Sequence, residues 1–345
     1  MDRILVLSVD TEADLLDRER NSVASIENVH WLQEICEKCG VCPAYLLTYE
    51  MATRDQPISV IRPYLERGLC EVGHHLHIWT TPPMERPNAY GVDVAWIDGF
   101  QSEIPDDIFA QKMASLHKAI QQHYDVIPSI HRAGRWAIDR RTLEWLIEHR
   151  YVVDASICAR TTWEDVRGVR EFLSLDARNT PNCPYRPDYG DITRSADRPT
   201  RELGILEVPV TGVECDWLGQ NRIKGQHLIR RFLWRCGYTG SPALSLRPSF
   251  HLPDRVFERM VRDLYASDLP VLHLMLHSNE LGTGGSPKSK TPELAADIRK
   301  RLVYALETAS EYGITGLPIS KLPEYWRRLN RCLQRRGPTF AVGKG

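Results

Sequence analysis

Three histidines lie within four positions of the segment 71–79, which reads EVGHHLHIW. Neutral imidazole is both a metal ligand and a proton carrier, and an extended strand sends alternate side chains to the same side. His75 and His77 could therefore bind one ion together, whereas His74 would face the opposite way. A surface strand with incidental histidines is the alternative, and the concentration of three histidines after a glycine weakens it.

Ionisable residues also end other short apolar runs of the chain. The segment SVDTEAD places Asp10 and Glu12 on one side of a strand by the same alternation. Further polar residues follow the runs that end in HRAGRW, VVDAS and LHLMLHSNE, namely Arg132, Arg135, Trp136, Asp154, His277 and Glu280. Unpaired ionisable groups are costly to bury, so we expect these side chains to meet and to neutralise one another or a metal.

Metal-assisted hydrolysis is the chemistry that this set of residues favours. Two histidines and one carboxylate form a common catalytic zinc site, in which one coordination position stays open for water or a substrate carbonyl. A second carboxylate can accept a proton from water, and a histidine on the opposite wall can protonate the leaving group. An arginine beside the base would keep that carboxylate ionised and oriented.

The elements that must position these residues alternate along the chain. Short apolar runs with strand character are separated by amphipathic segments with apolar residues at helical spacing, which is typical of parallel strands joined by helices. The expected strands are 3–9, 43–49, 69–77, 129–132, 151–156, 205–210, 271–277 and 314–320. Eight strands predict a barrel, and the polar residues would then meet at the mouth formed by the carboxyl ends of its strands.

Two segments, 160–204 and 211–250, interrupt this alternation. Both follow expected strands, so we interpret them as insertions that build the substrate-binding side of the mouth. Within the second, residues 221–238 could form a basic amphipathic helix for peripheral contact with a membrane, or could pack on the barrel or on another subunit. We expect one domain over residues 1–335 and a short tail over 336–345.

The order of the motifs resembles that of the NodB-homology polysaccharide deacetylases, the family-four carbohydrate esterases, and especially their WalW-like branch. SVDTE, VGHHLH, HRAGRW, VDAS and HLMLH correspond in order to the Asp motif, the Gly-x-His metal motif, the Arg motif, the second Asp motif and the late Leu-x-x-His motif of that family. The resemblance covers roughly residues 3–280. Each motif alone is weak, but the ordered set is specific.

The resemblance implies a distorted (β/α)7-8 barrel and a metal-dependent enzyme. Asp10 would be the catalytic base paired with Arg132, and His277 would be the general acid with Asp154 as its partner. His75 would be the first metal-binding histidine. Members of the family use zinc or a similar divalent ion, such as Co²⁺, Ni²⁺ or Fe²⁺, to remove N-acetyl groups, and sometimes O-acetyl or formyl groups, from amino sugars.

This sequence departs from the family pattern at two metal ligands. The usual second aspartate is replaced by Thr11, and we assign its role to Glu12, which shares a side with Asp10. The position of the usual second histidine holds Trp79. We therefore expect His77 to replace that histidine, as in the WalW-like branch.

Several of these residues could have structural roles instead. Asp10 could cap a helix, Arg132 could anchor Asp154 or Glu207, and His277 could be a satisfied core histidine, as we expect for His273. Trp79 and Trp136 could form a wall that stacks on a sugar, or could pack in the core. The residues expected to contact polar groups of the substrate, or to form structural pairs, are Arg135, Arg247 and Glu280.

The composition excludes some partners. With 345 residues, 42% hydrophobic content and a formal net charge of −1, the chain is an ordinary globular protein without a field that would attract nucleic acid. The apolar run in the start MDRILVLSVD is too short and too soon interrupted for a signal peptide or a membrane segment, so we expect a cytoplasmic protein. The protein could form an oligomer.

The triplet Cys36, Cys39 and Cys42 has metal-site spacing but lacks a nearby fourth soft ligand, which favours a structural interpretation.

Three other functions compete with a deacetylase of acylated amino sugars. Hydrolysis of a cyclic amide or ureide on the same fold is the nearest alternative. Amidohydrolases and PHP-type phosphoesterases also use a His-x-His pair, but they place it on the first strand, where this chain has carboxylates. A catalytically idle glycan-binding relative would be expected to lack one of the proton-transfer residues, and all are present here.

Overall fold

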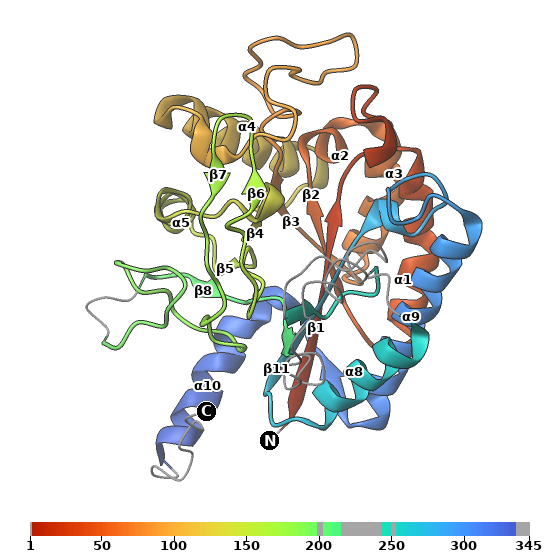
Figure 1. Ribbon diagram of the computed structural model, residues 1–345, viewed down its shortest axis with the longest axis vertical. Helices are drawn as coiled ribbons and strands as arrows, with labels where there is room; N and C mark the ends of the chain where they lie inside the picture. Colours follow the sequence, from red (N-terminus) through yellow and green to blue (C-terminus); the bar gives the residue numbers. More distant parts are fainter. Residues whose placement is uncertain (1, 199–202, 215–242, 250–252, 336–345) are drawn as a thin grey trace, which may run out of the picture.

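The structure is a computed structural model that describes residues 2–198, 203–214, 243–249 and 253–335. Strands and helices alternate along the chain, as the periodicity predicts (Figure 1). The strands of the main sheet are β1 (Arg3–Thr11), β2 (Pro43–Leu47), β3 (Glu71–Leu76), β4 (Ile130–Ala133), β5 (Val153–Asp154), β8 (Leu206–Glu207), β11 (Val271–His277) and β12 (Ile314–Gly316).

The main sheet is parallel and curls into a distorted barrel. Its strands follow the order β11-β1-β2-β3-β4-β5-β8, and β12 pairs with the first residues of β1. Two backbone hydrogen bonds bridge the gap between the ends of this sheet. The Thr211 N–H donates to the His273 carbonyl, and the Met275 N–H donates to the Leu246 carbonyl, each over 3.2 Å. The expected (β/α) barrel class is therefore confirmed, in a form that is incompletely closed.

Helices surround the outer face of the sheet (Figure 1). They begin where polar residues satisfy free backbone N–H groups: the Asp139 carboxylate accepts the Thr142 N–H over 2.8 Å, and the Thr291 hydroxyl accepts the Leu294 N–H over 3.4 Å. The helices are α1 (Asn28–Lys38), α2 (Tyr49–Thr53), α3 (Asp55–Glu66), α4 (Asp106–Tyr124), α5 (Arg140–Glu148), α8 (Asp254–Ala266), α9 (Pro292–Glu311) and α10 (Leu322–Arg335).

The chemistry of the barrel interior changes along the strands. Alternate strand residues face this interior, and those near the amino ends of the strands are apolar. They form one buried cluster that includes Ile4, Val6, Ile130, Val153 and Val271, closed from below by Leu322 at the start of α10. Further along the same strands, the interior residues are polar and buried: Ser8, Asp10, His75, Arg132 and His273. The polar layer thus lies at the carboxyl mouth of the barrel, as predicted.

Each expected strand is present, but several are shorter than the patterns predict. Strands β5 and β8 are two residues long, although strands over 151–156 and 205–210 were expected. The expected strand 314–320 ends at Gly316 and continues as a 3-10 turn over Ile319–Lys321. Helices α2 and α10 were not predicted, since α2 is short and the apolar residues of α10 are sparse.

The two insertions contain small antiparallel pairs. In the first, β6 (Val166–Arg167) pairs with β7 (Phe172–Leu173), and the Glu103 carboxylate accepts backbone N–H groups from residues 169–171 in the turn between them. In the second, β9 (Gly212–Glu214) pairs with β10 (Ala243–Ser245). The segment 221–238, for which membrane contact was considered, and the tail 336–345 lie outside the described residues. None of the described helices combines the length and apolar character that crossing a membrane requires.

The cysteine triplet has no site of its own in the described part of the chain. Cys36 is buried in the main hydrophobic core, and Cys39 and Cys42 are half-buried free thiols. The group of metal-ligating side chains found among the described residues does not include them.

Candidate active site

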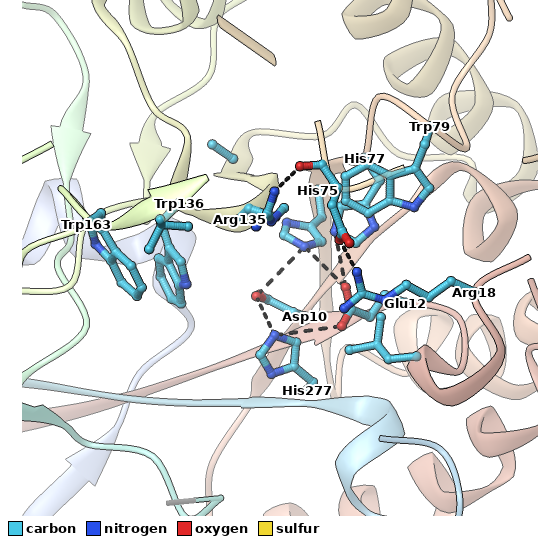
Figure 2. A pocket seen from close by; sticks show the side chains of 14 residues that line it. Asp10, Glu12, Arg18, His75, His77, Trp79, Arg135, Trp136, Trp163 and His277 are labelled. Atoms are coloured by element: carbon cyan, nitrogen blue, oxygen red, sulfur yellow. Dashed lines mark hydrogen bonds and ion pairs between the residues drawn. The ribbon is translucent and has the colours of Figure 1, made fainter. Parts of the chain in front are cut away.

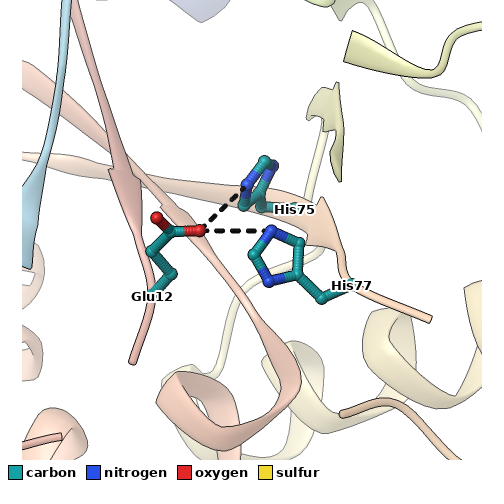
Figure 3. A group of neighbouring side chains, drawn as sticks. All are labelled: Glu12, His75 and His77. Carbon is teal, nitrogen blue, oxygen red and sulfur yellow. Dashed lines mark ion pairs between the residues drawn. The ribbon is translucent and has the colours of Figure 1, made fainter. Parts of the chain in front are cut away.

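Glu12, His75 and His77 come together at the carboxyl mouth of the barrel, where β1 and β3 end (Figure 3). The Glu12 Oε2 atom lies 3.1 Å from Nε2 of His77 and 3.9 Å from Nε2 of His75. Two ligand atoms that bind one tetrahedral zinc ion lie roughly 3.3 Å apart, given the usual bond lengths. The three side chains therefore fit the ligand set of a divalent metal.

Both histidines present a lone pair rather than a charge. The Nδ1–H of His75 donates to the Arg132 carbonyl over 3.0 Å, which leaves the lone pair on Nε2, the atom on the side of Glu12. Burial lowers the pKa of His75 to about 4 and the pKa of His77 well below its ordinary value. His77 also stacks on Trp79, with ring centroids 4.2 Å apart. Trp79 thus orients the candidate metal ligand His77 in addition to lining the pocket.

Glu12 is a buried carboxylate that a cation would stabilise. Burial, together with the nearby Asp10 charge, raises the pKa of Glu12 to about 7. The Asn279 side-chain amide donates to Glu12 Oε1 over 3.3 Å, so the other oxygen remains available to the histidine side of the site. Because a bound divalent cation would offset the cost of burying this charge, the donor set suits such an ion.

Asp10 is held ionised by Arg132. The Arg132 Nη1–H donates to Asp10 Oδ1 over 2.6 Å, and both side chains are buried. Burial alone would favour the neutral acid, but the charge and the hydrogen bond of Arg132 lower the pKa of Asp10. Its second oxygen, Oδ2, lies 3.8 Å from His75 Nε2 and 3.7 Å from His277 Nε2. This oxygen faces the pocket and can accept a proton there.

His277 closes the opposite wall of the site (Figure 2). Its Nε2 atom lies 3.7 Å from Asp10 Oδ2 and 3.8 Å from Glu12 Oε1. On the other side of the ring, Nδ1 lies 3.0 Å from Arg247 Nη2 and 3.2 Å from Glu280 Oε1. When Arg247 donates to Nδ1, the proton of the neutral ring is on Nε2, which faces the pocket.

The structure places Arg247 and Glu280 behind His277, and not on the pocket wall where contacts with substrate were expected. Both are buried, and Arg247 Nη2 lies 3.4 Å from Glu280 Oε1. The Lys288 ammonium lies 3.3 Å from the same oxygen. Although burial opposes ionisation, Lys288, His277 and Arg247 hold the pKa of Glu280 well below its ordinary value. Lys288 was not singled out from the sequence.

Asp154 does not take its expected place beside His277. Its carboxylate accepts hydrogen bonds from His131 over 2.6 Å and from the Ser156 hydroxyl over 2.8 Å, on the outer face of the sheet. Val153 and Ala155 face the barrel interior. Because side chains alternate along a strand, Asp154 between them faces the helices. Glu280 contacts the His277 ring where Asp154 was expected to do so.

The pocket in front of these groups has a volume of about 220 Å³. Trp79, Arg135 and Trp136, for which substrate contact was considered, line it. Trp163 stacks on Trp136 with the ring centroids 5.7 Å apart. Further lining residues that the sequence did not reveal are Leu15, Arg18, Asp98 and Val166. They lie in loops and in the first insertion, where no periodic pattern relates sequence position to the pocket.

Two arginines bond to Asp98 at this pocket. Arg18 forms an ion pair with the Asp98 carboxylate, and Arg135 donates to the Asp98 carbonyl. Arg135 and Trp136 both have left-handed backbone conformations, with φ of 54° and 62°. Such conformations are uncommon for residues with side chains and concentrate at functional sites.

No protein-family model matches this sequence, and no curated protein matches it significantly. Solved structures do share its fold. A candidate polysaccharide deacetylase from Mycobacterium smegmatis has a TM-score of 0.52 at 14% identity, covering 96% of this chain and 92% of its own. A candidate glycoside hydrolase/deacetylase from Parabacteroides distasonis has a TM-score of 0.56 at 12% identity, covering 95% and 71%.

The 4-alpha-glucanotransferase from Thermococcus litoralis also matches, with a TM-score of 0.50 at 11% identity, over 93% of this chain and 40% of its own. At such identities the similarities show the fold alone, and the same fold serves more than one reaction. The fold is that of the NodB-homology polysaccharide deacetylases, as the resemblance predicted. The WalW-like branch stays a prediction.

Proposed function

We propose that the protein is a metal-dependent hydrolase that removes an N-acetyl or other small acyl group from an amino sugar. The observation that carries this proposal is the meeting of a metal-ligand set, an arginine-clamped carboxylate and a histidine at one pocket. Those three parts match the metal, base and acid that amide hydrolysis needs. The fold, shared with structures described as deacetylases, supports the same function.

Glu12, His75 and His77 would hold the cofactor, Zn²⁺ or another divalent ion such as Co²⁺, Ni²⁺ or Fe²⁺. When bound, this ion supplies a Lewis acid that polarises the acyl carbonyl and lowers the pKa of water. Asp10 accepts the proton that water loses as its oxygen attacks the carbonyl carbon. Arg132 keeps Asp10 ionised and oriented for this transfer.

His277 completes the reaction as the general acid. In its imidazolium form, with the Nδ1–H directed at Glu280 Oε1, the ring donates its Nε2 proton to the departing nitrogen as the acyl C–N bond breaks, and is left neutral. The products are a carboxylate and a free amine on the sugar. Glu280 and Arg247 hold the His277 ring, and the Glu280 carboxylate favours the positive charge that the ring carries when protonated.

The pocket supports a small acylated sugar as the group that is recognised. Its volume of about 220 Å³ is below the roughly 300–1,000 Å³ of pockets for drug-sized ligands. Three tryptophans supply apolar faces, and Arg18, Asp98 and Arg135 supply polar groups. Such mixed walls suit a sugar ring, which has apolar faces and polar edges. If the protein acts in the cytoplasm, as the sequence predicts, its substrate would be a nucleotide-linked or lipid-linked glycan precursor or a small glycoside.

Acetate release tests this function directly. The purified protein is treated with a chelator, then supplied with zinc, and assayed on a panel of free, oligomeric and nucleotide-linked N-acetylated amino sugars. We expect acetate release from at least one substrate class, loss of release after chelation and recovery with zinc. Hydrolysis that persists in chelator would contradict the metal role. Ring-opened products from cyclic amides, or sugar binding without turnover, would instead support the two competing functions on this fold.

A further inference from the structure

Four titratable side chains form a row on the outer face of the sheet, behind the catalytic layer. His74 of β3 pairs in register with His131 of β4, His131 with Asp154 of β5, and Asp154 with Glu207 of β8. All four are fully buried. Because side chains alternate along a strand, this row faces the helices, while the residue after each member faces the barrel interior. We name this row the outer ladder.

Hydrogen bonds connect the members of the outer ladder to the ends of their strands. The His131 Nδ1–H donates to Asp154 Oδ1 over 2.6 Å, and the Ser156 hydroxyl donates to the same oxygen over 2.8 Å. The Ala133 N–H in turn donates to the Ser156 hydroxyl over 2.8 Å. Burial, together with the neighbouring Asp154 charge, raises the pKa of Glu207 well above its ordinary value.

Stability alone does not account for this row. His74 Nδ1 and His131 Nε2 are buried atoms with no hydrogen-bond partner among the described residues. Each buried polar atom without a partner destabilises the folded state, and well-packed apolar side chains at these positions would avoid that cost. The outer ladder therefore calls for a role other than stabilisation.

The strands that carry the outer ladder have few backbone bonds to fix their register. Strands β5 and β8 are two residues long, and β4 pairs with β5 at only two positions. A slip by one residue would turn every side chain of a strand to the other face of the sheet. Directional side-chain bonds across β4 and β5 oppose such a slip where the backbone ladder is weakest.

The residue that follows His131 is central to both halves of the candidate active site. The Arg132 carbonyl accepts the Nδ1–H of His75 over 3.0 Å and so sets the tautomer of a metal ligand. The Arg132 side chain donates to Asp10 over 2.6 Å and to the Ala155 carbonyl over 2.7 Å. A displacement of β4 relative to β5 would therefore disturb the metal ligand and the base together.

We propose that His131 is a positioning residue for the catalytic centre. Through its bond to Asp154, it holds β4 against β5 and keeps Arg132 at the level where it orients Asp10 and His75. The imidazole itself faces away from the pocket and does not touch substrate. This inference rests on the proposed function, because it assigns His131 a part in the same reaction.

Two amide variants of similar polarity test the proposal. In His131→Asn, the side-chain NH₂ can take the place of Nδ1–H and donate to Asp154, whereas in His131→Gln the amide lies one bond further out. We expect His131→Gln to lower kcat and to weaken zinc binding, each by about ten- to a hundred-fold, with little change in KM. His131→Asn should recover most of both quantities. The matched control is His117→Gln, which changes a half-buried histidine bonded to Tyr151, outside the outer ladder, and should leave both quantities unchanged.

Three readouts separate the failure of this proposal from the failure of the proposed function. If the wild-type protein releases no acetate, the function fails, and zinc affinity still compares the two variants. If the wild type also binds no zinc, crystal structures decide: the Arg132–Asp10 contact should be broken in His131→Gln and kept in His131→Asn. Equal effects of the two variants, or wild-type values in His131→Gln, would overturn the positioning role.

Discussion

The two oxygens of the Asp10 carboxylate have different neighbours, and this asymmetry defines its role. Oδ1 is bound by Arg132, while Oδ2 faces His75, His277 and the pocket. An Asp10→Asn substitution keeps the shape but removes the proton acceptor. We expect acetate release to fall by about a hundred- to ten-thousand-fold, which is the usual contribution of a general base, with zinc content unchanged. Turnover within a few-fold of the wild type would contradict the assignment.

Glu280 distinguishes a role in orienting His277 from a role in binding substrate. The carboxylate accepts the backbone N–H of His277 over 3.1 Å and lies beside Nδ1 of the His277 ring. It does not belong to the residues that line the pocket. In Glu280→Gln, a buried charge that supports the imidazolium is lost. We expect kcat to fall about tenfold, in proportion to one charged hydrogen bond, with KM unchanged. A raised KM at constant kcat would restore the substrate-binding interpretation.

The alternation of side chains made most of the site predictable at the level of single residues. Asp10 with Glu12 and His75 with His77 are pairs two positions apart on strands, and all four face one point. The expected place of Asp154 was wrong, because Asp154 faces the helices, whereas Arg247 and Glu280 form the structural pair that was the alternative to substrate contact. Their placement depends on contacts between distant strands and on loop geometry, and no local pattern encodes either of these.

At the scale of elements, the β6–β7 hairpin supplies part of the pocket wall and is tethered by one side chain. Glu103 accepts N–H groups from residues 169–171 and from Phe100, which lowers the pKa of Glu103 despite its partial burial. Glu103→Ala removes the side chain that tethers this turn. We expect faster amide hydrogen exchange over 166–173 and a KM raised about three- to tenfold, with kcat preserved. Unchanged exchange would show that the hairpin is held by other contacts.

The order and type of the main strands and helices follow from sequence periodicity, whereas the elements that were missed have tertiary causes. Strands β5 and β8 are short because the chain beyond them bonds to side chains in place of a neighbouring strand. After β5, for example, the Ile157 backbone N–H donates to the Glu207 carboxylate over 3.1 Å. Helix α10 was missed because few of its residues over 322–330 are buried, although its first turn closes the apolar end of the barrel. The insertions have no periodic pattern from which to infer a structure.

At the scale of the whole molecule, the metal site couples stability to pH. The pKa of Glu12 is about 7 in the folded metal-free protein and about 4.5 in the unfolded chain. Between these values the folded state binds more protons, so the metal-free protein loses stability as pH rises through this window. Zinc binds the ionised carboxylate and displaces that proton. Stabilisation by zinc should therefore increase as the pH rises towards about 7.

Thermal unfolding checks this coupling. The melting temperature of zinc-loaded protein minus that of chelator-treated protein should grow from about pH 5 to about pH 7 and then level off. In Glu12→Gln the difference should be small and nearly constant over the same range, because the titrating carboxyl is absent. A difference that does not vary with pH in the unsubstituted protein would contradict the raised pKa.

The central claim is that Glu12, His75 and His77 bind one divalent ion beside Asp10. Anomalous diffraction from zinc-soaked crystals, recorded on either side of the zinc absorption edge, tests it most directly. We predict one strong peak about 2.0–2.2 Å from Glu12 Oε2, His75 Nε2 and His77 Nε2, and no such peak in Glu12→Gln crystals. Crystals in which these three side chains are ordered and show no zinc peak between them would contradict the account.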